Sequence, residues 1–137
     1  MRQIFADTAY WLALTNPFDQ HHEKATRASA SLQGKRIVTS DAVLTEYLNA
    51  LADKGSTFRL AAVRSVETIL RNPGVIVIAQ TRKLFMKGFA LYKARADKGY
   101  SLTDCVSMAI MRQQKITNAL TTDHHFEQEG FGVLMRQ

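Results

Sequence analysis

Cysteine is almost absent from this chain of 137 residues, which contains only Cys105. A single thiol can form no internal disulfide and supplies no cysteine-based metal site, so we expect a reducing compartment and no redox chemistry. The sequence also lacks an apolar run approaching the roughly 20 residues of a membrane span, and Asp7 interrupts the first apolar run before it resembles a signal segment. We therefore expect a cytoplasmic protein without a membrane partner.

Two motifs of phosphate chemistry are missing as well. No glycine-rich loop follows any predicted strand, which argues against a P-loop nucleotide enzyme. A phosphatase with an aspartyl nucleophile at the end of the first strand would typically carry a second acid two residues after Asp7, and that position is Ala9. Both classes of enzyme are therefore disfavoured.

Positive charge, in contrast, is in excess. The chain has 18 Lys and Arg residues against 12 Asp and Glu residues, a formal net charge of +6 and a sequence pI near 9.7. This balance suits a polyanionic partner such as nucleic acid. The cations are spread along the chain rather than gathered into one tract, so charge alone favours nucleic acid only weakly.

The order of predicted elements favours an α/β fold. A hydrophobic content of 46% is enough for one core, and we expect a single domain over residues 1–137. Strands that alternate with helices of about 10 to 15 residues predict a parallel sheet of four or five strands flanked by helices on both faces. The expected strands cover 3–6, 37–39, 75–78, 118–121 and 133–135, and the expected helices cover 8–14, 20–33, 43–51, 58–71, a segment ending near 96, and 101–114.

Three local expectations follow from these patterns. The continuous β-branched run 75–78 is typical of a strand buried on both faces of a parallel sheet. Phe85, Phe89 and Tyr92 have the i, i+4, i+7 spacing of a helix stripe, which we expect to face the core. Asp19 is expected to cap the helix that continues to about Gln33.

Four acids fall where the carboxyl ends of the strands are expected: Asp7, Glu46, Asp104 and Asp123. Each belongs to a different βα unit, and in a doubly wound sheet these ends share one edge. Neighbouring carboxylates repel one another and raise one another's pKa, and a divalent cation removes that cost. Oxygen ligands without cysteine favour Mg²⁺ or Mn²⁺ over Zn²⁺.

Each acid also has a structural interpretation. Ser101 and Asp104 have the spacing of a helix capping box, Asp123 is placed to cap a short segment, and Glu46 fits an exposed or ion-paired helix residue. Asp7 is the hardest to explain in this way, because it ends an apolar strand where an unpaired buried charge is costly.

The histidines form two adjacent pairs, 21–22 and 124–125. Neighbours in a helix face different directions, so neither pair is expected to chelate a metal. His124 or His125 is a candidate for a contact with substrate phosphate, because Asp123 is adjacent in sequence.

Several segments together resemble a known family. Over nearly the whole chain the sequence resembles the PIN-domain family and, within it, the VapC-type toxin ribonucleases. The segments that carry the resemblance are Ile4-Phe5-Ala6-Asp7-Thr8-Ala9, Thr45-Glu46, Ser101-Leu102-Thr103-Asp104-Cys105 and Thr121-Thr122-Asp123-His124-His125-Phe126.

The resemblance implies an endoribonuclease that uses Mg²⁺ or Mn²⁺ and whose four acids map onto Asp7, Glu46, Asp104 and Asp123. One ion would be held mainly by Asp7 and Asp104, with the other two acids binding directly or through water; the number of ions stays open. Four further side chains are candidates for ordering the site or touching substrate: Thr8, Ser101, Thr121 and His124.

The resemblance further implies a homodimer that is neutralised by a small VapB-like antitoxin, whose C-terminal segment enters a groove beside the site. The apolar faces of residues 47–51 and 63–70 are the candidate contacts, although core burial is the simpler role for most of them. Two alternatives remain open: a PIN nuclease of RNA processing that is not a toxin, and a PIN module that grips RNA or a protein without cutting it.

Overall fold

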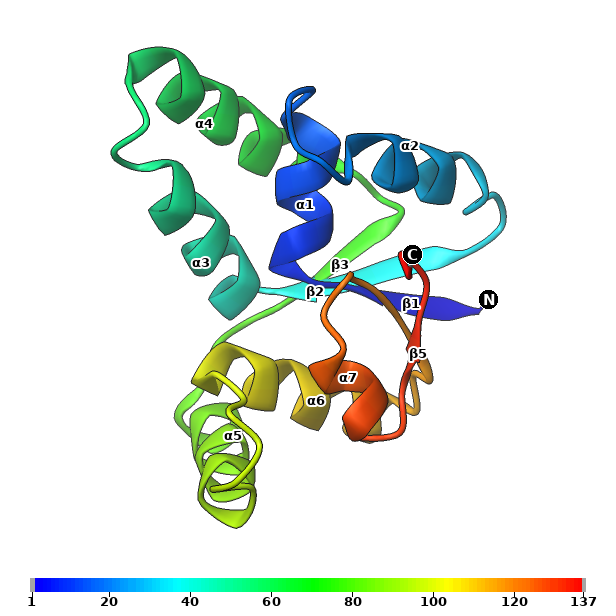
Figure 1. The fold of residues 1–137 in the computed structure, drawn as a ribbon, viewed down its shortest axis with the longest axis vertical. Helices are drawn as coiled ribbons and strands as arrows, with labels where there is room; N and C mark the ends of the chain where they lie inside the picture. The colour runs from blue at the N-terminus through cyan, green and yellow to red at the C-terminus, as the bar shows by residue number, and fades with distance from the viewer. Residues whose placement is uncertain (1, 137) are drawn as a thin grey trace.

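Five short strands form one parallel sheet in the computed structural model, which describes residues 2–136. The predicted α/β class, with four or five parallel strands and helices on both faces, is confirmed (Figure 1). The strands are β1 (Gln3–Ala6), β2 (Arg36–Ser40), β3 (Val75–Ile78), β4 (Asn118–Leu120) and β5 (Gly132–Val133).

The helices of the described residues lie on the two sides of this sheet (Figure 1). On one side are α1 (Thr8–Thr15), α2 (His22–Ala30), α3 (Asp41–Leu51) and α4 (Ser56–Arg71); on the other are α5 (Arg82–Ala94), α6 (Leu102–Gln114) and the short α7 (His125–Gln128). None of these helices combines the length and apolar character that crossing a bilayer requires.

The strand order β3-β2-β1-β4-β5 creates a switch point beside β1. The chain moves outward from β1 to β3 and then crosses to the other side of β1 to build β4 and β5. In open α/β sheets, ligands bind outside the carboxyl ends of the strands where the order reverses. The carboxyl ends of β1 and β4 therefore mark the edge at which a site is expected.

The centre of the sheet is built by the most buried strand, β1. Its residues Ile4, Phe5 and Ala6 are fully buried, and Phe5 pairs with strand β2 on one side and strand β4 on the other. The pairing continues one residue further, because the Asp7 backbone N–H donates to the Leu120 carbonyl at 3.2 Å. Asp7 is thus held at the central point of the carboxyl edge.

The expectation that 75–78 is buried on both faces is wrong. Strand β3 pairs with β2 alone and lies at the edge of the sheet, and all four of its residues are only half-buried. A continuous β-branched run favours a strand, but it does not distinguish a central strand from an edge strand.

The predicted aromatic core stripe on α5 is also wrong. The side of α5 that faces the core carries Leu84, Gly88 and Leu91, whereas Phe89 and Tyr92 are 37% and 49% exposed. Gly88 lets α5 approach α6 so closely that a Cβ at this position would lie 2.5 Å from a methyl group of Val106. The aromatic stripe and the stripe of Leu84, Gly88 and Leu91 have the same spacing and differ by one residue. Because α5 approaches α6 closely at Gly88, the stripe with the smaller side chains faces the core.

Helix α2 begins later and ends earlier than the sequence predicts. The Asp19 carboxylate accepts the His21 backbone N–H at 2.8 Å and orders the turn before the helix, rather than capping it. The helix ends at Ala30 instead of near Gln33. The last strand is likewise shifted from 133–135 to Gly132–Val133, although Met135 beyond it is buried.

Candidate metal centre

Asp7 occupies the N-cap position of α1 but does not cap the helix through its side chain. The residue is only 5% exposed; its Oδ2 accepts a hydrogen bond from Thr121 Oγ1 at 2.9 Å, and its buried Oδ1 has no hydrogen-bond partner. Burial, followed by repulsion from Asp104, raises the pKa of Asp7 to about 7. Helix capping therefore does not account for this carboxyl group.

Asp104 lies in the first turn of α6 and is largely buried. Its Oδ2 accepts the Ser101 backbone N–H at 3.0 Å, and Ser101 Oγ accepts the Asp104 backbone N–H at the same distance. The capping box expected from the sequence is therefore present. Burial raises the pKa of Asp104, and the charges of Asp123 and Glu46 add to that effect. The capping box thus fixes the position of the Asp104 carboxylate but does not neutralise its charge.

Thr121 joins the two acids that follow β1 and β4. Its hydroxyl donates to Asp7 and accepts the backbone N–H of Asp123 at 3.0 Å. Asp123 in turn accepts the His125 backbone N–H on Oδ1 at 2.9 Å, at the start of α7. The hydroxyl of one buried threonine therefore sets the relative positions of Asp7 and Asp123.

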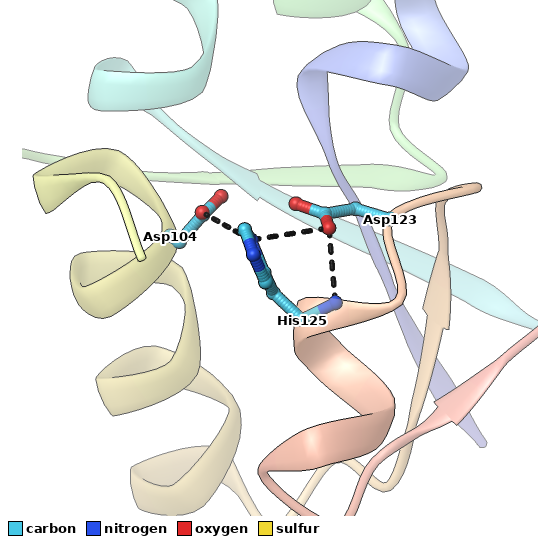
Figure 2. Close-up of side chains that lie close together, drawn as sticks. All are labelled: Asp104, Asp123 and His125. Atoms are coloured by element: carbon cyan, nitrogen blue, oxygen red, sulfur yellow. Dashed lines mark hydrogen bonds and ion pairs between the residues drawn. The ribbon is translucent and has the colours of Figure 1, made fainter. Parts of the chain in front are cut away.

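Three side chains converge between α6 and α7, as Figure 2 shows: Asp104, Asp123 and His125. One ligand atom from each lies within 4.8 Å of the others, a spacing that could hold a metal ion. His125 Nδ1 is 3.3 Å from Asp123 Oδ1 and 3.6 Å from Asp104 Oδ2, and this buried nitrogen has no hydrogen-bond partner.

Sequence reasoning did not predict that His125 lies with Asp104 and Asp123. The argument that adjacent histidines do not chelate together holds for the pair, because the His124 residue is exposed while the His125 ring points between the carboxylates. The available signal was the spacing of Asp123 and His125, since an aspartate commonly accepts the backbone N–H two residues later. That turn brings the third residue back toward the first.

The remaining predicted residues lie around this group. Glu46 is half-buried on α3 and outside the group of three, but its charge raises the pKa of both Asp7 and Asp104. Thr8 is buried directly after Asp7, and its Oγ1 has no hydrogen-bond partner. The structure thus places all four acids at one edge, with Glu46 at the periphery.

A second charged cluster holds this side of the site in place. The nearly buried carboxylate of Glu129 accepts hydrogen bonds from Arg95 and Arg112, both at 2.6 Å, and from the Tyr100 hydroxyl at 3.2 Å. The arginine hydrogen bonds lower the pKa of Glu129 to about 2. The cluster ties α7 to α5 and α6, and the Tyr100 ring lies 5.3 Å from the His125 ring.

The site lacks the counter-charge that Glu129 has. Within residues 2–136, neither Asp7 nor Asp104 nor Asp123 forms an ion pair with a lysine or arginine. Buried carboxylates are stable when they are paired, protonated or bound to a cation. Clustered oxygen donors with an unpartnered buried oxygen fit a divalent metal ion, and the imidazole adds one nitrogen donor.

Known proteins share this sequence and this fold. The 23S rRNA-specific endonuclease VapC20 of Mycobacterium tuberculosis is 33% identical over 131 residues, which cover 93% of this chain and 95% of the relative. The crystal structure of VapC20, described as a Sarcin-Ricin loop cleaving toxin, superposes with a TM-score of 0.82 over the same shares of the two chains.

Two more distant structures show the same fold. VapBC2 of Rickettsia felis, crystallised with a DNA fragment from its promoter, has a TM-score of 0.68 at 13% identity and covers 96% of each chain. FitAcB of Neisseria gonorrhoeae has a TM-score of 0.63 at 15% identity and covers 95% of each chain. Residues 4–131 also match the family described as PIN domain. The chain therefore belongs to the PIN-domain family and is a homologue of the VapC-type toxin endoribonucleases.

Proposed function

We propose that this protein is a divalent-metal-dependent endoribonuclease and acts in the cytoplasm as the toxin of a toxin–antitoxin pair. The observation that carries the proposal is the state of Asp7, a buried carboxyl group at the switch point of the sheet. Among residues 2–136, its Oδ1 has no hydrogen-bond partner and no lysine or arginine pairs with it. A fold stabilised by burial gains nothing from such a group, whereas a metal-dependent nuclease requires it.

Asp7, Asp104 and Asp123 would hold the ion, Mg²⁺ or Mn²⁺, with Glu46 acting through water from α3. A bound divalent ion stabilises charge on a phosphate and lowers the pKa of a bound water molecule, which is the chemistry that phosphodiester hydrolysis needs. Thr121 positions Asp7 and Asp123, and Ser101 fixes Asp104 through the capping box. His124 is exposed beside the site, where it can meet substrate phosphate.

RNA is the proposed substrate. The 33% identical relative is named for 23S rRNA, and the net charge of +6 suits a polyanion. A catalytically silent binding module is disfavoured because all four acids are present. A PIN nuclease of RNA processing would have the same catalytic site as a toxin but no antitoxin partner. Binding of an antitoxin therefore distinguishes these two functions.

The antitoxin groove is proposed between α1 and α4. Tyr47 and Leu51, two of the expected contacts, are buried in the core and cannot meet a partner. An apolar cleft of about 260 Å³ lies next to the exposed α4 residues instead, and it is lined by Trp11, Leu14, Thr15, Arg64, Ser65, Thr68 and Ile69. An amphipathic antitoxin segment would bury its apolar side in this cleft.

The proposed homodimer has a different candidate surface, the outer face of α5. Phe85 and Phe89 stack there with ring centroids 6.2 Å apart, and Tyr92 is half exposed. Figure 1 places α5 and α4 on opposite sides of the sheet, so a second copy and an antitoxin segment would not compete for one surface.

Replacing a central carboxylate should abolish cleavage. We expect Asp7→Asn and Asp104→Asn each to lower Mg²⁺- or Mn²⁺-dependent RNA cleavage by more than about 100-fold, because several kcal/mol of transition-state stabilisation depend on the metal. The measurement is the mapping of new 5′ ends in intact ribosomes and in purified 23S rRNA. Asp97→Asn, which removes an exposed acid in the turn before α6, is the control and should cleave normally. Equal cleavage by all three variants and the wild type would refute the proposed site.

The buried carboxyl group of Asp7 should also make the metal-free protein less stable at higher pH. A folded-state pKa near 7 lies above the unfolded value of 3.8, so the folded state holds the extra proton between these values and stability falls as pH rises through this range. In EDTA, Asp7→Asn should be more stable than wild type by an amount that grows from pH 5 to pH 8, toward a limit of about 4 kcal/mol. Urea unfolding at both pH values measures it. A difference that does not change with pH would contradict this account of Asp7.

The two partner surfaces can be separated in one experiment. The protein is co-expressed with the product of the reading frame immediately upstream, and the purified material is sized by light scattering. Thr68→Trp, which fills the cleft, should prevent capture of the small protein and leave the dimer intact; Phe89→Glu should give a monomer that still captures it. Loss of capture in Phe89→Glu alone would place the antitoxin on α5 and reject the groove.

A further inference from the structure

We propose that His125 is a nitrogen ligand of the metal ion in this site and shifts its preference from Mg²⁺ toward first-row transition ions such as Mn²⁺. This inference rests on the proposed metal-dependent function. It adds one metal ligand to the four acids and predicts which metal ion the site prefers.

The first support is the position of the imidazole. His125 Nδ1 is buried near two carboxylate oxygens, at 3.3 Å from Asp123 and 3.6 Å from Asp104; Figure 2 marks these ion-pair contacts with dashed lines, and neither has the geometry of a hydrogen bond. Adjacent ligand atoms around a six-coordinate ion with bonds near 2.1 Å are about 3 Å apart. His125 Nδ1 therefore lies only slightly farther from each carboxylate oxygen than two ligands of one ion lie from each other, and one ligand atom of each of the three residues lies within 4.8 Å of the others. Side-chain movements would bring the three atoms to the spacing of one ion's ligands.

The second support is that both the ring and the backbone of His125 are held in place. The Tyr100 ring packs 5.3 Å away, and the Tyr100 hydroxyl is fixed by Glu129. The backbone N–H of His125 is bound to Asp123. A ligand held by its surroundings in this way loses little conformational freedom when it binds metal.

A third and independent observation is the neighbouring Asp7, which is 5% exposed and has an unpartnered Oδ1. The Thr121 hydroxyl donates to Asp7 and accepts the Asp123 backbone N–H, which places Asp7 and Asp123 in one region. One imidazole, even if protonated, leaves the acids of this region in excess. An ion pair of His125 with Asp104 and Asp123 thus leaves the site negatively charged, whereas a divalent cation bound by these side chains supplies two positive charges and removes more of the repulsion.

The kind of ligand atom, oxygen or nitrogen, determines which metal ion the site prefers. Mg²⁺ takes oxygen ligands and keeps water in its shell, whereas imidazole nitrogen is a ligand of the transition ions. Replacing one oxygen with Nδ1 therefore weakens Mg²⁺ binding relative to Mn²⁺. His124 lies beside His125 with its ring 4.8 Å away, but the residue is exposed, which makes it the matched control.

The test uses the whole protein loaded with Mn²⁺ and reads the electron spin echo of the ion, which reports nitrogen bound directly to it. We expect a ¹⁴N signal in wild type and His124→Gln that disappears in His125→Gln. Titration calorimetry should show that His125→Gln weakens Mn²⁺ binding at least about tenfold and changes Mg²⁺ binding much less. Labelling histidine with ¹⁵N should replace the ¹⁴N pattern and identify the ligand as imidazole.

The other outcomes separate this inference from the proposed function. Mn²⁺ that binds, depends on Asp104 and Asp123, and shows no nitrogen signal would overturn the His125 assignment and leave the metal centre intact. A nitrogen signal that persists in His125→Gln and vanishes in His124→Gln would show that His124 is the ligand and would overturn the assignment of His125. Mn²⁺ binding that Asp7→Asn and Asp104→Asn do not affect would overturn both this inference and the proposed function.

Discussion

Repulsion between buried carboxylates is the constraint on which the site depends. The sheet delivers Asp7 to its central carboxyl edge, and α6 delivers Asp104 to the same edge. Burial raises the pKa of both groups; repulsion from Asp104 adds to it at Asp7, and repulsion from Asp123 and Glu46 adds to it at Asp104. Within residues 2–136 the chain supplies neutral hydrogen bonds from Thr121 and Ser101 but no lysine or arginine within ion-pair distance of these carboxylates. The free-energy cost of burying these charged carboxylates is offset only when protons or cations bind to them.

Another acid with a nearly buried side chain, Glu129, has a structural role in the same chain. Glu129 receives two arginines and a tyrosine hydroxyl, and the pKa of its carboxyl group falls to about 2, whereas that of Asp7 rises to about 7. Two buried acids in one domain thus have opposite environments. This contrast is the reason for proposing that the counter-charge of Asp7 comes from a bound cation. Glu129, by contrast, ties α7 to α5 and α6.

Much of this architecture could be predicted from the sequence, because strands that alternate with helices impose a parallel sheet whose carboxyl ends share an edge. The parts that failed depend on tertiary contacts. The aromatic spacing of Phe85 and Phe89 is as regular as that of the true core stripe, and only the close approach of Gly88 to α6 decides between them. The position of His125 beside the carboxylates could not be predicted for a similar reason: it depends on the turn at Asp123 and on the position of α7 against α6.

The central claim is that the acids at the switch point hold a divalent cation. Anomalous diffraction from crystals of the protein grown with Mn²⁺ tests it most directly, because the ion is located without reference to activity. The account predicts one anomalous peak or two, bounded by the carboxylates of Asp7, Asp104 and Asp123. Crystals that contain Mn²⁺ elsewhere on the molecule, with no peak between these carboxylates at a pH above 7, would contradict it.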